Sequence, residues 1–446
     1  MILSRQFRDK TEESFDFEIT TTSSPQTVEF LMGAGGRMSV SNYHRIDWGD
    51  GSDPEPINSS VYLPHEYLVA GGYTIKIWTR EKNYNITNFG GNRLGTGMNI
   101  TNLDFSDFKS INQFLMPTVG TVGTITMPTE YEGTAGANWS NIGGALTFSS
   151  TILDLSFYNN RIDRFFMQGN VNIERIKTPL INLDQNCQFF FSGSPGLTAI
   201  GPSADNLSNF DADFTNFNIG GQFRLKGTGI NPTSIILPAN AFSINAISNL
   251  YYVDNLGCTT MDLSNLKMTS STNLTLIIIN NPNLTNITWP TSSSVPGTVS
   301  SLSVRGNPLL TGSADLSWVR LQDDAGVQYK DSLITSIQLP VSSATLSTID
   351  IRPGQCAQIN LLDVPNATEQ NDFALLMQDN GMNASEVNRI LTELDTNATN
   401  SFTGRSINLS GTNAAPDTTS GGLDGSAAKT SLIGKGFSVT TSKLWK

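Results

Sequence analysis

A short apolar motif recurs along the middle of this 446-residue chain, and it constrains the fold more than any other sequence feature. Each copy has apolar residues at positions i and i+2, followed within four residues by Asn or a small residue. Successive copies begin 36, 34, 28, 25, 26 and 47 residues apart, and the last gap is close to two of the shorter periods. The pairs are Leu153/Leu155, Phe189/Phe191, Phe223/Leu225, Tyr251/Val253, Leu276/Ile278, Leu302/Val304 and Ile349/Ile351.

This spacing predicts one short strand per copy, with the paired side chains pointing into a core. The best copies, 189–200 and 276–287, continue through a Ser/Asn-Pro corner into an apolar return. A single unit cannot bury its own apolar face, so neighbouring units must stack into a solenoid. The pattern resembles irregular (BspA-like) leucine-rich repeats, which are joined to PKD-like domains in bacterial surface proteins and phage fibres. The usual Leu-x-x-Leu run before the strand is eroded here.

The residue between the two members of each pair should point out of the solenoid, along one face of the sheet. We expect these residues to form a binding surface with an exposed apolar stripe of Phe190, Tyr252 and Ile277. The alternative is that another segment or subunit covers the stripe. The complete row is Asp154, Phe190, Arg224, Tyr252, Ile277, Ser303 and Asp350.

Alternating apolar residues predict strands over 14–21, 28–32 and 72–78, at the start of the chain. Between them lie an Asp-Trp-Gly-Asp-Gly run and a His-x-Tyr triplet, and the last strand contains Gly-x-Tyr-x-Ile-x-Ile. These three parts resemble, in order, the motifs of PKD-like β-sandwiches over residues 10–80. We expect a structural turn rather than a cation site, and a packed histidine. The motif residues are Asp47, Trp48, Gly49, Asp50, Gly51, His65, Tyr67 and Tyr73.

The last part of the chain predicts helices over 385–395, capped by Ser385, and over 427–433, ended by Gly434 and Gly436. Strands are expected over 406–411 and 437–441. This order resembles the terminal module of many phage tail-fibre and virion repeat proteins, over residues 380–441. Such a unit would shield the last strand edge of the solenoid. The Gly-Lys-Gly at 434–436 is a helix stop, because the strand-loop-helix order of a phosphate loop is missing.

The amino-acid composition argues against several classes of function. Charged residues are 15% of the chain, with 27 Lys and Arg against 39 Asp and Glu, for a formal net charge of −12. This balance disfavours nucleic acid as a partner, since phosphate binding needs clustered cations. Two histidines and three cysteines without ligand spacing indicate no metal or other cofactor. We expect the cysteines Cys187, Cys258 and Cys356 to be small buried residues.

No pattern in the chain predicts an enzyme. A β-helical polysaccharide-degrading spike is the least favoured alternative, with Asp211/Asp213 and Asp323/Asp324 as carboxylate pairs that lack aromatic residues at matching repeat positions. The charged N-terminus shows no signal peptide, and no apolar run reaches the length of a membrane span. These features predict a protein made in the host cytoplasm and carried on a virion.

The sequence therefore predicts a mainly β chain of three domains. They are a PKD-like β-sandwich (1–82), an irregular leucine-rich-repeat solenoid (83–378) and a small α+β cap (379–446). The expected function is that of a bacteriophage virion structural protein, a tail fibre or adhesin-like appendage. Expected partners are other virion proteins, further copies of the chain in a trimer, and a host-surface polysaccharide or protein. A capsid decoration or head-fibre protein and a bacterial surface adhesin remain alternatives.

Overall fold

The structure is a computed structural model with two compact units, Met1–Asn206 and Leu207–Lys446, which are described separately. The fold is mainly β, with two α-helices in the described residues, and contains a β-solenoid. The described residues are 14–31, 43–57, 62–79, 99–104, 113–114, 122–126, 137–142, 146–148, 150–155, 162–168, 172–177, 187–192, 197, 199–201, 211–213, 219–226, 234–236, 249–254, 257–264, 266, 273–290, 298–341, 344–363, 366–399 and 402–443.

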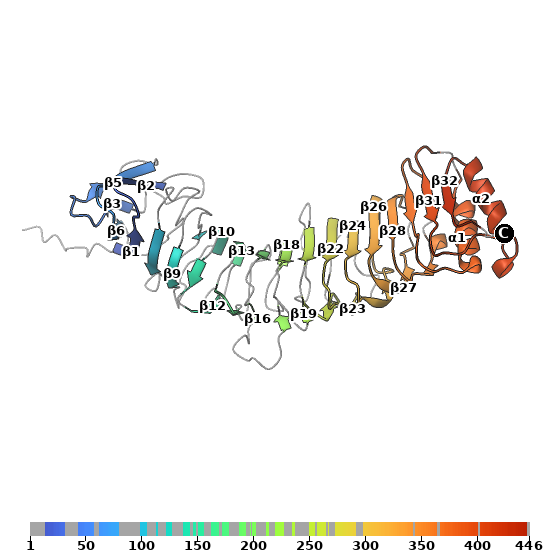
Figure 1. Ribbon diagram of the computed structural model, residues 1–446, viewed down its shortest axis with the longest axis horizontal. Helices are drawn as coiled ribbons and strands as arrows, with labels where there is room; N and C mark the ends of the chain where they lie inside the picture. The colour runs from blue at the N-terminus through green and yellow to red at the C-terminus, as the bar shows by residue number, and fades with distance from the viewer. Residues whose placement is uncertain are drawn as a thin grey trace, which may run out of the picture. The chain divides into compact units, whose positions relative to one another are not determined.

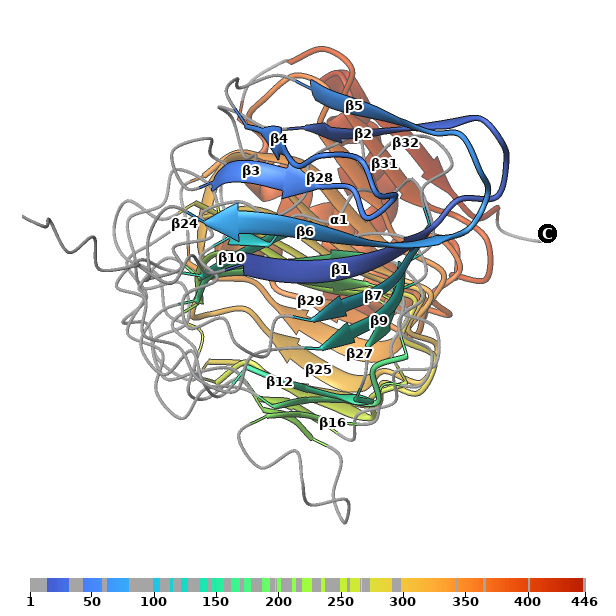
Figure 2. The same ribbon diagram turned by 90° about the vertical axis from the view of Figure 1, so that its left-hand side faces the viewer.

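The first unit begins with two antiparallel sheets, because alternating apolar residues give each strand one buried face. Strand β1 (Ser14–Thr20) pairs with β6 (Gly72–Thr79), which pairs with β3 (Tyr43–Asp47) and through it with β4 (Glu55–Pro56). Strand β2 (Gln26–Leu31) pairs with β5 (Tyr62–Tyr67). Phe17, Ile46, Ile75 and Val28 are buried. The strands expected over 14–21, 28–32 and 72–78 are confirmed, and Figure 2 shows β1 beside β6.

The sheet that contains β1 continues past residue 82. Strand β7 (Asn99–Asp104) pairs antiparallel with the free side of β1, and β9 (Val122–Thr126) and β11 (Leu146–Phe148) then add in parallel. Segments that the sequence assigned to a sandwich and to a solenoid therefore share one sheet.

The rest of the first unit consists of parallel strands in two further sheets. One contains β8 (Gln113–Phe114), β10 (Ala137–Ile142), β13 (Ile162–Gln168) and β15 (Cys187–Ser192). The other contains β12 (Ile152–Asp154), β14 (Arg175–Lys177) and β16 (Ala199–Gly201). The chain alternates between these sheets from β12 to β16, as the turns of a solenoid require.

The second unit repeats this alternation on a longer ladder of parallel strands (Figure 1). In sheet order the ladder is β18 (Ile219–Lys226), β20 (Asn249–Asp254), β22 (Asn273–Ile279), β24 (Thr298–Arg305), β26 (Arg320–Lys330), β28 (Leu346–Ile351), β30 (Ala374–Leu376), β31 (Ser406–Leu409) and β32 (Ser438–Thr441). The intervening segments supply β17 (Asp211–Asp213), β19 (Ser234–Ile236), β21 (Thr260–Asp262) and β23 (Asn286–Thr288), followed in a separate sheet by β25 (Thr311–Asp315), β27 (Leu333–Gln338) and β29 (Gln358–Ile359).

The apolar pairs fill the interior as predicted. Both members of six of the seven pairs are at most 1% exposed, and the side chains of Phe189 and Phe191 lie outside the described residues. The long last gap contains an extra strand, β26, whose Val327 and Tyr329 are equally buried. The gap therefore does contain two of the shorter periods.

Strands β22 and β24 of the second unit end in tight corners that are held by buried asparagine side chains. Asn280, Gly306 and Asp331 have positive φ values of 56°, 65° and 53°, which Gly and Asn tolerate best. The residue after the first two corners is a fully buried asparagine. Asn307 Oδ1 accepts from the backbone N–H and the side chain of Asn281, at 2.9 and 3.1 Å. Asn307 Nδ2 donates to Ile278 O at 3.1 Å, so the side chain ties one turn to the previous one.

Buried asparagine side chains also link consecutive turns near the end of the chain. Asn413 Oδ1 accepts from Asn380 N at 3.1 Å, and Asn413 Nδ2 donates to Met377 O at 2.8 Å. Asn380 in turn donates to Ile351 O at 2.7 Å. These amides therefore bond backbone groups at the corners that the backbone does not pair with itself.

In the C-terminal segment, two helices alternate along the chain with the last strands of the ladder. Helix α1 (Ala384–Asn397) lies between β30 and β31, and α2 (Gly425–Gly434) lies between β31 and β32. The expected apolar face of α1, formed by Val387, Ile390, Leu391 and Leu394, is buried. The short 3-10 helices η1 (Leu361–Asp363) and η2 (Ser420–Gly422) precede α1 and α2.

One detail of the C-terminal prediction was wrong, the residue that caps the first helix. Asn383, not Ser385, caps α1, because its side chain accepts from Glu386 N while the Glu386 carboxylate accepts from Asn383 N. The final strand β32 is the last strand of the described ladder, so the segment extends the sheet. Neither helix in the described part is long and apolar enough to cross a membrane.

Candidate binding surfaces

The second unit brings most of the predicted outward row together. In the strand register, Arg224 pairs with Tyr252, Tyr252 with Ile277 and Ile277 with Ser303. Gln328 of β26 comes next, between Ser303 and Asp350. Neighbouring strands lie about 4.8 Å apart, so these residues form one row across the sheet.

The two ends of this row differ in character. Tyr252 and Ile277 are half-buried, and the Tyr252 hydroxyl donates to Asp254 at 3.1 Å. Ser303 is 8% exposed and Asp350 only 2%. The Asp350 carboxylate contacts Lys330 Nζ at 2.6 Å and Arg352 Nε at 2.9 Å. Because its charge is already paired, Asp350 serves the structure rather than an open binding face.

Two members of the predicted row lie in the first unit. Asp154 is on β12, in the sheet with β14 and not among the strands that hold Phe190, and it contacts Lys177 at 3.7 Å. Its placement in the row was wrong, because the Leu153/Leu155 pair belongs to the second strand of a turn. Phe190 is on β15 beside Phe166, and the side chains of Phe190 and Arg224 lie outside the described residues.

The Asp-Trp-Gly-Asp-Gly run forms a tight turn. Asp47 Oδ1 accepts from Gly49 N at 2.9 Å, and Asp50 Oδ1 accepts from Ser52 N at 3.0 Å. Gly49 is required by its φ of 77° and by a space in which a Cβ would lie 2.2 Å from Thr74 O. Gly51 also has positive φ, at 88°. One oxygen of each carboxylate is therefore bonded within the turn itself.

A stack of rings fastens this turn to the sheet. His65 lies flat on Trp48, with ring centroids 4.6 Å apart, and its Nε2 is 2.9 Å from Asp50 Oδ2. The buried Tyr67 hydroxyl donates to Trp48 O at 2.8 Å, and its ring is 4.2 Å from that of Tyr73. His65 therefore packs between the Trp48 ring and the Asp50 carboxylate.

Two groups in this stack have shifted pKa values. Burial would raise the pKa of Asp50, but hydrogen bonds from Ser52 and His65 outweigh it and lower the pKa to about 2. Burial, reinforced by the Asp50 charge, raises the pKa of Tyr67. The stack is therefore a neutral tyrosine beside a charged carboxylate at neutral pH.

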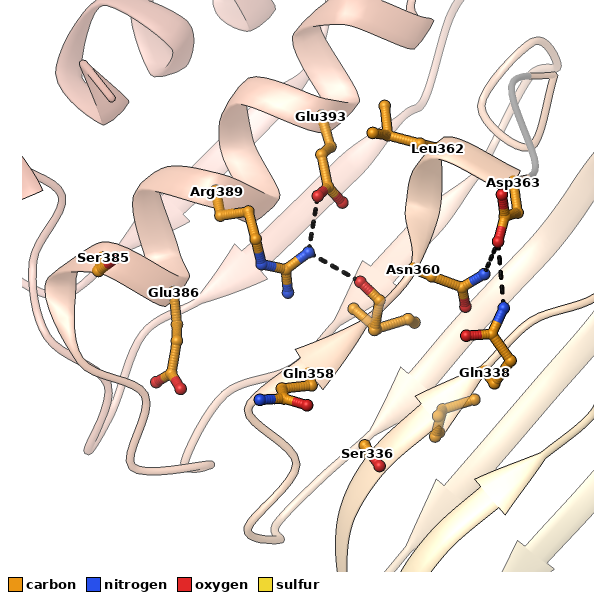
Figure 3. A pocket seen from close by; sticks show the side chains of 12 residues that line it. Ser336, Gln338, Gln358, Asn360, Leu362, Asp363, Ser385, Glu386, Arg389 and Glu393 are labelled. Atoms are coloured by element: carbon orange, nitrogen blue, oxygen red, sulfur yellow. Dashed lines mark hydrogen bonds and ion pairs between the residues drawn. The ribbon is translucent and has the colours of Figure 1, made fainter. Parts of the chain in front are cut away.

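A groove of about 630 Å³ lies in the second unit between helix α1 and strands β27 and β29 (Figure 3). Sequence reasoning missed it, because its residues come from three segments that share no motif. The spacing of its helical residues at 385, 386, 389 and 393 is the one available signal, since they lie on one helix face. The lining residues are Ser336, Ile337, Gln338, Gln358, Ile359, Asn360, Leu362, Asp363, Ser385, Glu386, Arg389 and Glu393.

Arg389 crosses the groove from the helix to the sheet. Its Nη1 donates to Ile359 O at 2.9 Å and to Glu393 Oε1 at 2.8 Å. Its Nη2 and Glu393 Oε2 are both buried and have no hydrogen-bond partner among the described residues. Asp363 closes the far side, where it accepts from Gln338 Nε2 at 3.1 Å and from Asn360 Nδ2.

The remaining candidate groups have structural roles where they are described. Asp323 Oδ1 accepts from Thr345 N at 3.1 Å, Asp324 adopts a positive φ of 65°, and the side chains of Asp211 and Asp213 lie outside the described residues. Within the described ranges no three His, Cys, Asp or Glu residues are grouped as metal ligands. Cys258 and Cys356 are buried and free, as expected, and burial raises the pKa of each to about 12. The Cys187 side chain is outside the described part.

Comparison of this chain with protein-family models, with curated proteins and with solved structures finds no match in any of the three.

Proposed function

We propose that this protein is a bacteriophage virion structural protein, a tail fibre or adhesin-like appendage without catalytic activity. The observation that carries the proposal is the ladder of parallel strands from β18 to β32, in which each turn rests on its neighbours. Stacked turns of this kind give a rigid body with repeated side-chain rows, which suits attachment better than chemistry.

The finer assignments belong to the same proposal. The turn around Trp48 and Asp50, with His65 stacked on it, supports a PKD-like β-sandwich at the N-terminus. The corner asparagines Asn281 and Asn307 support an irregular leucine-rich-repeat solenoid, and helices α1 and α2 support an α+β cap. In this arrangement the sandwich attaches to the particle, and the solenoid faces the host surface or a neighbouring subunit.

Mass spectrometry of purified phage particles, followed by immunogold electron microscopy, tests the proposal. We expect the chain among the particle proteins and the gold label on a tail appendage. Label on the capsid would instead identify a decoration or head-fibre protein, and absence from washed particles would contradict a virion role. Light scattering of the purified chain tests the trimer, for which a monomer at micromolar concentration would be the contrary result.

A further inference from the structure

We propose that the groove between α1 and strands β27 and β29 binds a neutral, hydroxyl-rich saccharide segment. The juxtaposition that carries this inference is a cavity of about 630 Å³ lined by amides, hydroxyls and carboxylates from three segments of the second unit. This volume lies within the range of about 300–1,000 Å³ found for ligand sites. The inference relies on the proposed function only for the source of the saccharide, a glycan of the host surface.

The groove retains polar groups that are not fully used by hydrogen bonds within the protein. Asn360 and the Gln338 amide nitrogen already serve Leu339 and Asp363. This leaves the amide oxygen of Gln338 and the second oxygen of Glu386 as acceptors, since Asn383 N bonds only one of the Glu386 oxygens. Arg389 Nη2 is a donor without a partner among the described residues, so the groove offers both acceptors and donors, and sugar hydroxyls can pair with either.

Groups that can both donate and accept complete the lining. The Gln358 amide and the Ser336 and Ser385 hydroxyls face the same space as Glu386, as Figure 3 shows. A sugar hydroxyl also does both, so it pairs with such groups without leaving a buried polar atom unsatisfied.

Charge argues against an anionic ligand. The lining contains three carboxylates, Asp363, Glu386 and Glu393, and a single cation, Arg389, which is already paired with Glu393. An acidic sugar or a phosphate would bring a further negative charge next to uncompensated carboxylates. None of the twelve lining residues is aromatic, and Leu362 is the one with a large exposed apolar side chain, at 56%, so the groove lacks the aromatic anchors that are typical of protein–protein interfaces.

Titration of the full chain with maltotriose, cellotriose and mannotriose, followed by calorimetry and saturation-transfer NMR, tests this inference. Trigalacturonate is the anionic comparison. We expect at least one neutral trisaccharide to bind, and trigalacturonate to bind more weakly. Gln358→Ala should weaken binding about tenfold, the loss expected for one or two hydrogen bonds. Gln355→Ala is the matched control, because Gln355 is exposed, close in sequence and outside the groove, and it should leave the affinity unchanged.

A charge-changing variant sharpens the result. Glu393→Gln releases Arg389 from its ion pair and lowers the negative charge of the groove, so it should raise the affinity for trigalacturonate. Failure of all three neutral trisaccharides to bind would overturn the inference, as would an equal loss in the Gln355 and Gln358 variants.

Particle proteomics separates the two proposals. A saccharide-binding chain that is absent from particles contradicts only the virion role, whereas a particle protein that binds none of the sugars contradicts only the groove assignment.

Discussion

Replacement of Asn307 by Ala should open one turn of the second unit. The wild-type side chain is fully buried and makes three hydrogen bonds, two of them to Asn281 and one to Ile278 O. Its loss removes about 1 kcal/mol per bond and leaves the Asn281 N–H buried without an acceptor, so the local cost should be about 3 kcal/mol or more. That free energy corresponds to an increase of about 100-fold in the population of the opened turn.

Hydrogen exchange followed by mass spectrometry measures this opening directly, because it reports local stability without assuming that the whole chain unfolds at once. A peptide covering 274–284 should exchange about 100-fold faster in the variant, by the same conversion. Asn286→Ala is the control, since Asn286 is exposed and its amide makes only a long contact of 3.5 Å with Thr288. Equal exchange in the two variants would refute the structural role assigned to Asn307.

Three further predictions concern glycine corners, thiols and acid stability. Gly306→Ala should destabilise the second unit by about 1 kcal/mol more than Gly312→Ala, because both have positive φ but only the Gly306 Cβ would approach another atom, Asn280 Oδ1 at 2.6 Å, so that the Asn280 side chain would have to move. Equal urea midpoints would contradict this. Cys258 and Cys356 should resist alkylation at pH 8 until the protein unfolds, because burial raises each pKa to about 12, and peptide mass spectrometry reads the labelling. The pKa of Asp50 is lowered from 3.8 to about 2, so the charged carboxylate stabilises the fold above about pH 4 and this stabilisation is lost as the pH falls through 2. The difference in melting temperature between the wild type and Asp50→Asn should therefore shrink between pH 5 and pH 2.

The strands and their inward side chains could be predicted from the sequence because their cause is local. Pairs such as Leu276/Ile278 and Leu302/Val304 alternate within one strand, and burial of one face follows from the pleat. The same logic located the buried face of α1, where Val387 and Leu391 are four residues apart on one side of the helix.

Features that depend on contacts between distant segments could not be predicted in this way. Asp154 fitted the repeat pattern, but which of two sheets receives its strand is decided by neighbouring turns. The helix cap moved from Ser385 to Asn383 because only Asn383 completes a reciprocal pair with Glu386. The groove depends on Arg389 reaching Ile359 O, thirty residues earlier in the chain, and no short motif encodes such a distance.

The hydrogen bond between Asn281 and Asn307 shows that consecutive turns of the second unit have equivalent corners, so a turn can be added or removed as a unit. The two residues occupy equivalent places in consecutive turns, 26 residues apart. Because Asn307 ties its turn to the preceding one, insertion or deletion of one such 26-residue segment should change the length of the ladder by about 4.8 Å and leave the asparagine-held corners of the other turns intact. Gene duplication within this region would therefore adjust reach in fixed steps, without redesign of a core.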